Sequence, residues 1–227
     1  MMNQSKAAKL EAAIRELTRP IKGQYPRPWM TSSKDPASSK VFVVGMNQAK
    51  GFPEGDVGSH VEYLDALFNR GQKTMRQLYD KVTKGQGSPT RNNIDDLVRR
   101  LKLHGVTDVL ETNVICYSTP MSSDLRRRLH TGGTARGREI FQSLLDVIGP
   151  KILIAHGAGT AREFRKSLRI DFPEPPKKCP SKPTEVKLGE MSVFLIPSLA
   201  PPAVNKWSSW RNEHLDQLCQ MVSARLG

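Results

Sequence analysis

The sequence has few cysteines and no long apolar run. Its 227 residues include three cysteines, Cys116, Cys179 and Cys219, and none of them forms a CxxC pair. This usage argues against a disulfide framework, a zinc finger or an iron–sulfur site, and it favours a reducing, intracellular compartment such as the cytoplasm, nucleoid or nucleus. No apolar run approaches a membrane span, and the N-terminus lacks a signal-peptide core. We therefore expect no membrane partner.

Several catalytic motifs are also missing. There is no G-x-S-x-G elbow, no cysteine beside a histidine and no P-loop lysine, and the five histidines show no metal spacing. We expect no metal site, no cofactor and no nucleophilic triad. The turn HGAGT at 156–160 gives G-x-G, with Arg162 in the place of the third glycine. A plain strand-to-helix turn is the simpler interpretation, but an enzyme acting on a free nucleotide stays an alternative.

Positive charge is abundant. Lysine and arginine exceed aspartate and glutamate to give a formal net charge of +13. Such an excess favours polyanionic partners, nucleic acid before an anionic membrane surface.

The hydrophobic pattern predicts strands that alternate with helices. Apolar runs beginning at Val41, Val106, Lys151 and Met191 predict four strands. Helical patterns cover 5–17, 60–70, 73–83, 94–103 (capped by Asn92 or Asn93), a segment from Thr134, a segment through Leu168 and a segment from Ser208. Residues 171–190 are rich in proline and lysine and predict an extended loop. The alternation predicts a three-layer α/β/α domain over 40–227 with a central, mainly parallel four-stranded sheet, and 1–39 predicts an N-terminal helix and extended segment that packs on it.

Polar residues follow three of the apolar runs. Gly45 is expected to break the first strand into a loop that carries Asn47, the second run ends on Asn113, and the fourth ends on Pro197 and Ser198. Ligands of open α/β sheets bind outside the carboxyl ends of the strands, so we expect these residues to face one pocket. A carboxamide cannot abstract a proton at neutral pH, but it offers both a donor and an acceptor to a flipped base.

Three short motifs then carry a family resemblance. GMN at 45–47 resembles the first motif (GMNPG) of the single-strand-selective monofunctional uracil-DNA glycosylases, and TNVICYSTP resembles their second (NLCPL). PSLAPPAVNKW resembles their last motif, which opens HPS and closes on Asn-Lys and Trp. The motifs occur in the same order and span residues 41–207. The resemblance implies the uracil-DNA glycosylase superfamily fold and a monomeric DNA repair enzyme of base excision repair, which hydrolyses an N-glycosidic bond in single- or double-stranded DNA and leaves an abasic product.

The resemblance also implies roles for individual residues. Asn47 would hold the water that attacks C1′, and Asn113 would read uracil through N3–H and O4. The other substrate-binding candidates are Gly45, Met46 (whose backbone would contact O2), Phe52 (as a stacking ring), Ile196 and Ser198. The alternatives stay open: an asparagine favoured by a turn, an asparagine capping a loop, and a core phenylalanine.

A further set of residues would contact DNA. The loop PSLAPPAVNK would enter the duplex as a wedge with Leu199 at its apolar tip, and Asn205 and Lys206 would fix a phosphate. The complete set of DNA-binding candidates is Pro197, Leu199, Asn205, Lys206, Arg126, Arg127 and Arg128, with Arg136 and Arg138 nearby. A proline-rich turn and a solvated basic helix face are the alternatives.

The sequence departs from the motifs at informative places. Gln48 and Ala49 replace Pro and Gly, Ala200 replaces a basic wedge residue, and Tyr117, Ser118 and Thr119 lengthen the second motif. Ile196 stands where the family has the His that donates to O2 of the leaving uracil, and losing such a donor costs about 10²–10³ in rate. A protein that binds DNA or a modified base without catalysis is therefore the alternative function.

Overall fold

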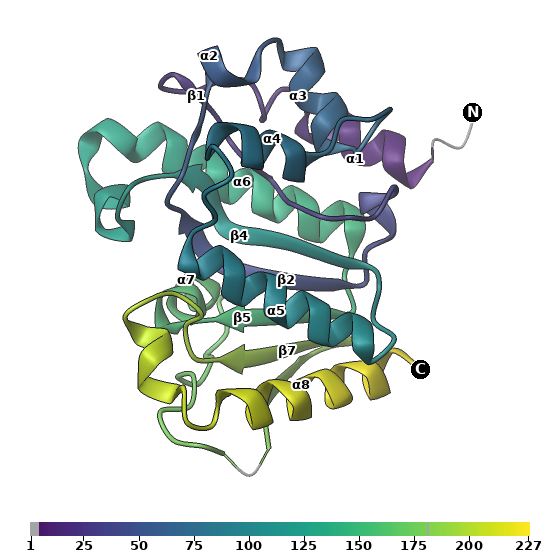
Figure 1. The fold of residues 1–227 in the computed structure, drawn as a ribbon, viewed down its shortest axis with the longest axis vertical. Helices are drawn as coiled ribbons and strands as arrows, with labels where there is room; N and C mark the ends of the chain where they lie inside the picture. The colour runs from purple at the N-terminus through teal and green to yellow at the C-terminus, as the bar shows by residue number, and fades with distance from the viewer. Residues whose placement is uncertain (1–4, 181) are drawn as a thin grey trace.

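The centre of the molecule is a five-stranded sheet with helices on both faces (Figure 1). The computed structural model describes residues 5–180 and 182–227. The strand order is β4-β2-β5-β7-β6, and the strands are β2 (Val41–Gln48), β4 (Val109–Ser118), β5 (Ile152–His156), β6 (Thr184–Leu188) and β7 (Met191–Ile196). Strands β4, β2, β5 and β7 are mutually parallel, whereas β6 runs antiparallel to β7. The α/β class and the mainly parallel sheet are confirmed, but the prediction of four strands is wrong.

The additional strand, β6, lies in the segment for which the sequence predicted a loop. It pairs with β7 from Thr184↔Leu195 to Leu188↔Met191, and only two residues separate the last pair. The first of these, Gly189, has φ +58, which suits the tight turn of a hairpin. The prolines and lysines before Thr184 dominated the composition of the segment, and the short alternating run TEVKL was therefore overlooked.

One face of the sheet is covered by α5 (Pro89–Leu103) and α8 (Arg211–Leu226), which cross in front of the strands in Figure 1. Both helices bury an apolar stripe at helical spacing, as an amphipathic surface helix requires. Their buried side chains and those of the sheet form one cluster, which includes Val41, Val43, Leu97, Leu101, Ile154, Phe194, Leu215 and Leu218.

The opposite face is covered by α6 (Thr131–Ile148), α7 (Ala158–Leu168) and α1 (Lys6–Arg15). Phe42 and Val44 of β2 alternate with the residues that face α5, because successive side chains of a strand point to opposite faces. They join a second cluster with Leu10, Ile14, Ile140, Leu144 and Phe164. The two clusters and the sheet between them give three layers.

The residues before β2 pack along the sheet edge formed by β4. The Arg27 N–H donates to the Cys116 carbonyl at 3.2 Å, and Met30 and Glu111 exchange backbone hydrogen bonds at 2.8 Å. Around them lie the ribbon of β1 (Gln24–Tyr25) and β3 (Phe52–Pro53), the helices α2 (Glu54–Val57), α3 (His60–Leu67) and α4 (Met75–Val82), and the 3-10 turn η1 (Pro36–Ser38). Within residues 5–180 and 182–227, no helix has both the length and the apolar content needed to cross a membrane.

Three local boundaries differ from the prediction. Gly45 does not break the first strand, because β2 continues through Asn47 to Gln48. Asn113 lies in the middle of β4 rather than at its end, and it pairs with Gly45. Helix α5 begins at Pro89 with Ser88 as its N-cap, so neither Asn92 nor Asn93 caps it. A serine followed directly by proline is a strong helix start, and proline needs no N–H at the first position.

Candidate functional site

A cavity of about 420 Å³ lies beyond the strand ends. It exists because neighbouring strands end at different heights. Pairing of β2 with β5 stops at Val44↔Ala155, whereas pairing of β2 with β4 continues to Gln48↔Ser118. The longer strands and the start of α5 therefore enclose space beyond the ends of β5 and β7. Numbered by their order along the chain, the four parallel strands lie side by side as 2-1-3-4. The order reverses between β2 and β5, and sheets of this kind bind ligands at such a switch point.

Asn47 and Asn113 both line this cavity, although both lie within strands. Each is half-buried. They come from two motifs that are far apart in the sequence, and the parallel pairing of β2 with β4 brings them to one wall.

Contacts of Asn47 fix the orientation of its amide. Its Nδ2 donates to Thr119 Oγ1 at 2.9 Å and to the Gln48 carbonyl at 3.1 Å. The Thr119 hydroxyl donates its own proton to the Met121 carbonyl at 2.8 Å, so the atom that faces Thr119 must be a donor. The amide oxygen Oδ1 is therefore the atom of Asn47 left to accept a hydrogen bond from a ligand or a water.

Gly45 allows two polar side chains to meet over β2. A Cβ at this position would lie 2.7 Å from Asn113 Oδ1 and 2.9 Å from His156 Nε2. Since real Cβ atoms do not approach other atoms so closely, only glycine leaves room for both. Asn113 comes from β4 on one side of β2, and His156 comes from the end of β5 on the other.

The sequence interpretation missed His156 as a site residue. It lines the cavity, and burial together with the positive charge of Arg91 lowers its pKa to about 4, so the imidazole is neutral at pH 7. Its Nδ1 is buried and has no hydrogen-bond partner among the described residues. His156 directly follows the apolar run ILIA, and the rule that singled out the other strand ends would have found it.

Further buried polar atoms in the wall also lack hydrogen-bond partners in the part of the chain that the structure describes. These atoms are Arg27 Nη1, Gln48 Oε1 and Arg91 Nε. Buried polar groups are nearly always satisfied, and unsatisfied ones concentrated in a single cavity indicate a place built for a ligand. Burial lowers the pKa of Arg27, with a further contribution from Arg91.

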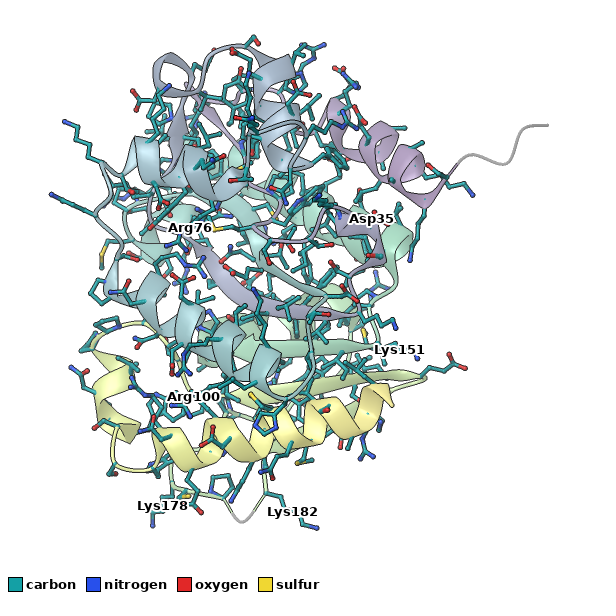
Figure 2. All side chains as sticks on the ribbon, turned by 45° about the vertical axis from the view of Figure 1, so that its right-hand side comes forward. Asp35, Arg76, Arg100, Lys151, Lys178 and Lys182 are labelled. Atoms are coloured by element: carbon teal, nitrogen blue, oxygen red, sulfur yellow. The ribbon has the colours of Figure 1, made fainter. Side chains whose placement is uncertain are left out.

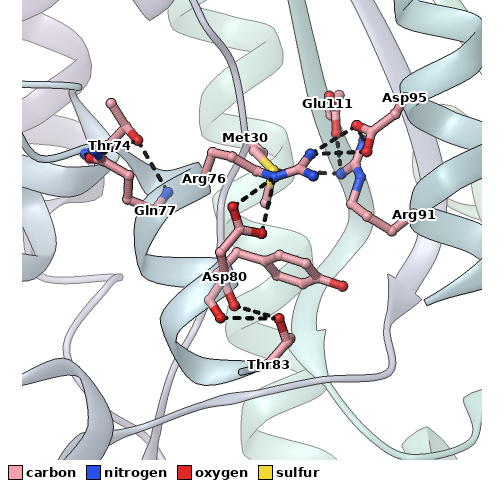
Figure 3. Close-up of polar contacts among 10 residues, drawn as sticks. Met30, Thr74, Arg76, Gln77, Asp80, Thr83, Arg91, Asp95 and Glu111 are labelled. Atoms are coloured by element: carbon pink, nitrogen blue, oxygen red, sulfur yellow. Dashed lines mark hydrogen bonds and ion pairs between the residues drawn. The ribbon is translucent and has the colours of Figure 1, made fainter. Parts of the chain in front are cut away.

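A cluster of ion pairs links α4 and α5 and reaches the cavity through Arg91 and Glu111 (Figure 3). Arg76 pairs with Asp80 at 3.2 Å and with Asp95 at 2.9 Å. Arg91 pairs with Asp95 at 2.9 Å and with Glu111. Burial raises the pKa of Glu111, and the neighbouring Arg91 opposes this effect. The sequence offered one indication of this cluster, a glutamate inside the apolar run VLETNV.

The other predicted substrate-binding residues divide into two groups. Met46 and Ser198 line the cavity, and Gly45 lies beneath Asn113 and His156. Phe52 and Ile196 do not line it; they are 1% and 0% exposed and belong to the two core clusters. Phe52 is covered by the Arg27 guanidinium, 5.4 Å from its ring centroid. As the chain is folded here, neither side chain reaches a ligand in the cavity.

Leu199 is also placed differently from the prediction. It is fully buried in the core cluster with Val204 and Trp207, so its side chain is not an exposed wedge tip. The exposed residues of this loop are Pro201 and Pro202, followed by Asn205 and Lys206 in the 3-10 turn η4 (Ala203–Trp207). Pro197 is half-buried. The loop borders the cavity through Ser198 and Ala200.

The predicted DNA-binding arginines lie outside the cavity lining. Arg126, Arg127 and Arg128 are exposed on the 3-10 turns η2 (Ser122–Arg126) and η3 (Arg128–His130), which follow β4. Arg127 pairs with Asp124 at 3.1 Å, and Arg138 pairs with Glu163 at 2.8 Å. Lys178 and Lys182 project from the loop before β6, far from η2 along the chain (Figure 2).

Within the described ranges, no group of three or more His, Cys, Asp and Glu side chains is arranged to hold a metal ion. No protein-family model matches the chain, and a search of curated proteins finds no similar sequence.

Proposed function

We propose that this protein is a monofunctional DNA glycosylase of the uracil-DNA glycosylase superfamily, which hydrolyses the N-glycosidic bond of a uracil or related damaged base flipped into the cavity. The observation that carries the proposal is the convergence of Asn47 and Asn113 on one cavity at the switch point of the sheet.

The geometry suggests how the side chains divide the chemistry. Asn113 would pair with the edge of the base, because its amide offers a donor and an acceptor and has no hydrogen-bond partner to displace among the described residues. Asn47 Oδ1 would accept from a water and aim it at C1′. As the bond between C1′ and the base breaks, its electron pair leaves with the base and the water oxygen bonds to C1′. The proton released from water finally resides on the base or in solvent.

His156 supports the same proposal from the neighbouring strand. It pairs in register with Ile196, the residue that stands where the family has a histidine. A neutral imidazole carries one N–H donor, and a donor aimed at the departing base stabilises the negative charge that develops there. His156 would thus supply the hydrogen-bond donor to the leaving base that Ile196 lacks.

An excision panel tests the proposal. Single- and double-stranded oligonucleotides containing uracil, hydroxymethyluracil, hypoxanthine or mispaired thymine are incubated with the purified protein, and abasic sites are detected by alkaline cleavage. We expect excision of at least one base without strand cleavage before alkali. Intact oligonucleotides across the whole panel would contradict the proposal.

A second candidate function is binding to DNA or a modified base without catalysis. The observation that favours it is the burial of Ile196 outside the cavity, which leaves the last motif without its polar group. Tight binding to an abasic-site analogue, with no excision by the wild-type protein, would favour this candidate. The turn HGAGT also lines the cavity, so affinity independent of DNA length would favour a free nucleotide as the ligand.

A further inference from the structure

Arg27 is held firmly in the wall of the cavity. Its backbone N–H donates to the Cys116 carbonyl at 3.2 Å, and its own carbonyl accepts from Gln48 Nε2 at 2.7 Å. Its guanidinium lies 5.4 Å from the ring centroid of Phe52 and 5.3 Å from that of Tyr79, and both rings are buried. The side chain is therefore oriented by packing before any ligand arrives.

The Arg27 guanidinium has no anionic partner in residues 5–180 and 182–227. No ion pair or hydrogen bond from its nitrogens is present there, and Nη1 is buried. The neighbouring acids do not serve it, because Asp80, Asp95 and Glu111 are already paired with Arg76 and Arg91 (Figure 3). This contrast distinguishes Arg27 from Arg76 and Arg91.

An unpaired cation at this depth is costly to the fold. Arginine keeps its proton under all ordinary conditions, so it cannot avoid the cost by becoming neutral. The faces of Phe52 and Tyr79 offset part of it, but an aromatic face does not replace the hydrogen bonds that the N–H groups made in water. No described residue completes this site, so an anionic group of a ligand in the cavity would offset the remaining cost.

The surroundings also favour negative charge. The starts of α5 and α7, at Ser88 and Gly157, line the same cavity, and helix N-termini carry a partial positive charge. Lys50 lies on the exposed rim. Gln48 Oε1 adds an unpartnered acceptor, which suits an N–H or O–H donor of the same ligand.

We propose that Arg27 binds an oxyanion of the ligand, either a carboxylate carried by a modified base or a phosphate of the nucleotide. The inference rests on the proposed function in taking this cavity as the place where the base binds. A guanidinium presents its N–H groups as a planar fork that matches both kinds of oxyanion. Arg27 would thus select the class of substrate rather than take part in bond cleavage.

Isothermal titration with small probes separates the two sources of the oxyanion. The probes are uracil, 5-carboxyuracil and inorganic phosphate, each titrated into the full chain. We expect at least one oxyanion probe to bind about tenfold or more tighter than uracil, as hydrogen bonds to a charged group allow. Preference for 5-carboxyuracil assigns the oxyanion to the base, and preference for phosphate assigns it to the nucleotide backbone.

Variants connect the preference to Arg27. Arg27→Met keeps an unbranched apolar stem between the two rings and removes the charge, and it should abolish the preference for the oxyanion probe. Arg27→Lys should keep part of it. Arg225→Gln, a change of an exposed arginine on α8 that pairs with Glu185 and does not line the cavity, is the matched control and should bind like the wild type. Thermal unfolding adds a readout, because loss of a ligand-binding cation should leave the melting temperature unchanged or higher, whereas loss of a structural cation should lower it.

The inference is overturned if no oxyanion probe binds the wild type better than uracil, or if the preference survives in Arg27→Met. Should Arg27→Met fail to fold, a crystal structure of the wild type with the bound oxyanion probe decides: contact with the guanidinium supports the inference, and contact elsewhere overturns it. Uracil excision measured in parallel keeps the two proposals separate. Absent excision contradicts the glycosylase activity alone, and binding independent of Arg27 contradicts this inference alone.

Discussion

Asn113 and His156 reach over β2 from opposite sides and lie against the same residue, Gly45. A Cβ at Gly45 would come within 2.7 Å of Asn113 Oδ1 and 2.9 Å of His156 Nε2. The residue that precedes Met46 and Asn47 is therefore glycine for a steric reason, and the polar side chains above it depend on that gap. The GMN motif at 45–47 therefore contributes two things: Gly45 leaves room for Asn113 and His156, and Asn47 provides a carboxamide.

This dependence predicts the effect of Gly45→Ala. The new methyl group would displace Asn113 or His156, and a shift of about 1 Å in a positioning group costs on the order of 10²-fold in rate. We expect single-turnover excision to fall by about that factor while the circular dichroism spectrum is unchanged. Gly132→Ala is the matched control, because a Cβ there meets only Ile21 Cδ1 at an ordinary 3.7 Å. Full activity in Gly45→Ala would show that the gap is not needed.

His156 predicts a pH dependence of stability. Its pKa is about 4 in the folded chain, against 6.5 for an ordinary histidine. Between these values the unfolded chain binds a proton that the folded chain does not, so the free energy of unfolding falls as the pH is lowered from 6.5 to 4. The shift corresponds to at most about 3 kcal/mol, fully present above pH 6.5.

Denaturant unfolding at a series of pH values measures this contribution. Burial also lowers the pKa of His60 and His214, so the wild-type curve alone does not isolate His156. His156→Gln should unfold with a shallower dependence between pH 6.5 and 4. Parallel curves for wild type and variant would mean that His156 is not the responsible group.

The parts of this fold that the sequence predicted are those fixed by hydrophobic pattern. Asn47 and Asn113 could be assigned to one pocket because parallel strands with polar residues near their carboxyl ends leave few other arrangements. Their places inside the strands were not predictable in the same way. Only the neighbouring strands decide where a strand stops, and β2 continues past Gly45 because β4 continues beside it.

The parts that the sequence did not predict depend on contacts between distant segments. Arg27 lies in a proline-rich extension, and nothing local indicates that its guanidinium packs between Phe52 and Tyr79. The burial of Leu199 depends similarly on Trp207, whose Nε1 donates to the Ser198 carbonyl at 3.0 Å and folds the loop back on the core.

Thr119 should act on excision through Asn47. Its hydroxyl accepts from Asn47 Nδ2, so Thr119→Val removes the contact that turns Oδ1 toward the cavity. We expect a fall of about tenfold or more in kcat with little change in KM, because a group that orients the water acts on the chemical step. Thr119→Ser restores the hydroxyl and should recover most of the rate.

The comparison with Asn47→Ala sharpens this test. That variant should lose excision and still bind DNA, because it removes the carbonyl that would aim the water. If Thr119→Val changes KM and leaves kcat intact, Thr119 contributes to binding rather than to the orientation of Asn47.

The exposed arginines after β4 predict a graded salt dependence of DNA binding. Arg126 and Arg128 have no ion pair among the described residues, whereas Arg127 forms an ion pair with Asp124. Replacing Arg126 or Arg128 with glutamine should make the slope of log affinity against log salt shallower, by about 0.9 per lost phosphate contact on duplex and about 0.7 on single strands. Arg127→Gln should change it less, and Arg138→Gln, whose arginine already pairs with Glu163, should not change it. Fluorescence anisotropy between 50 and 200 mM salt, about the range over which such contacts weaken, measures all four variants. If all four variants showed the same slope of log affinity against log salt as the wild type, the DNA would bind to another face of the molecule.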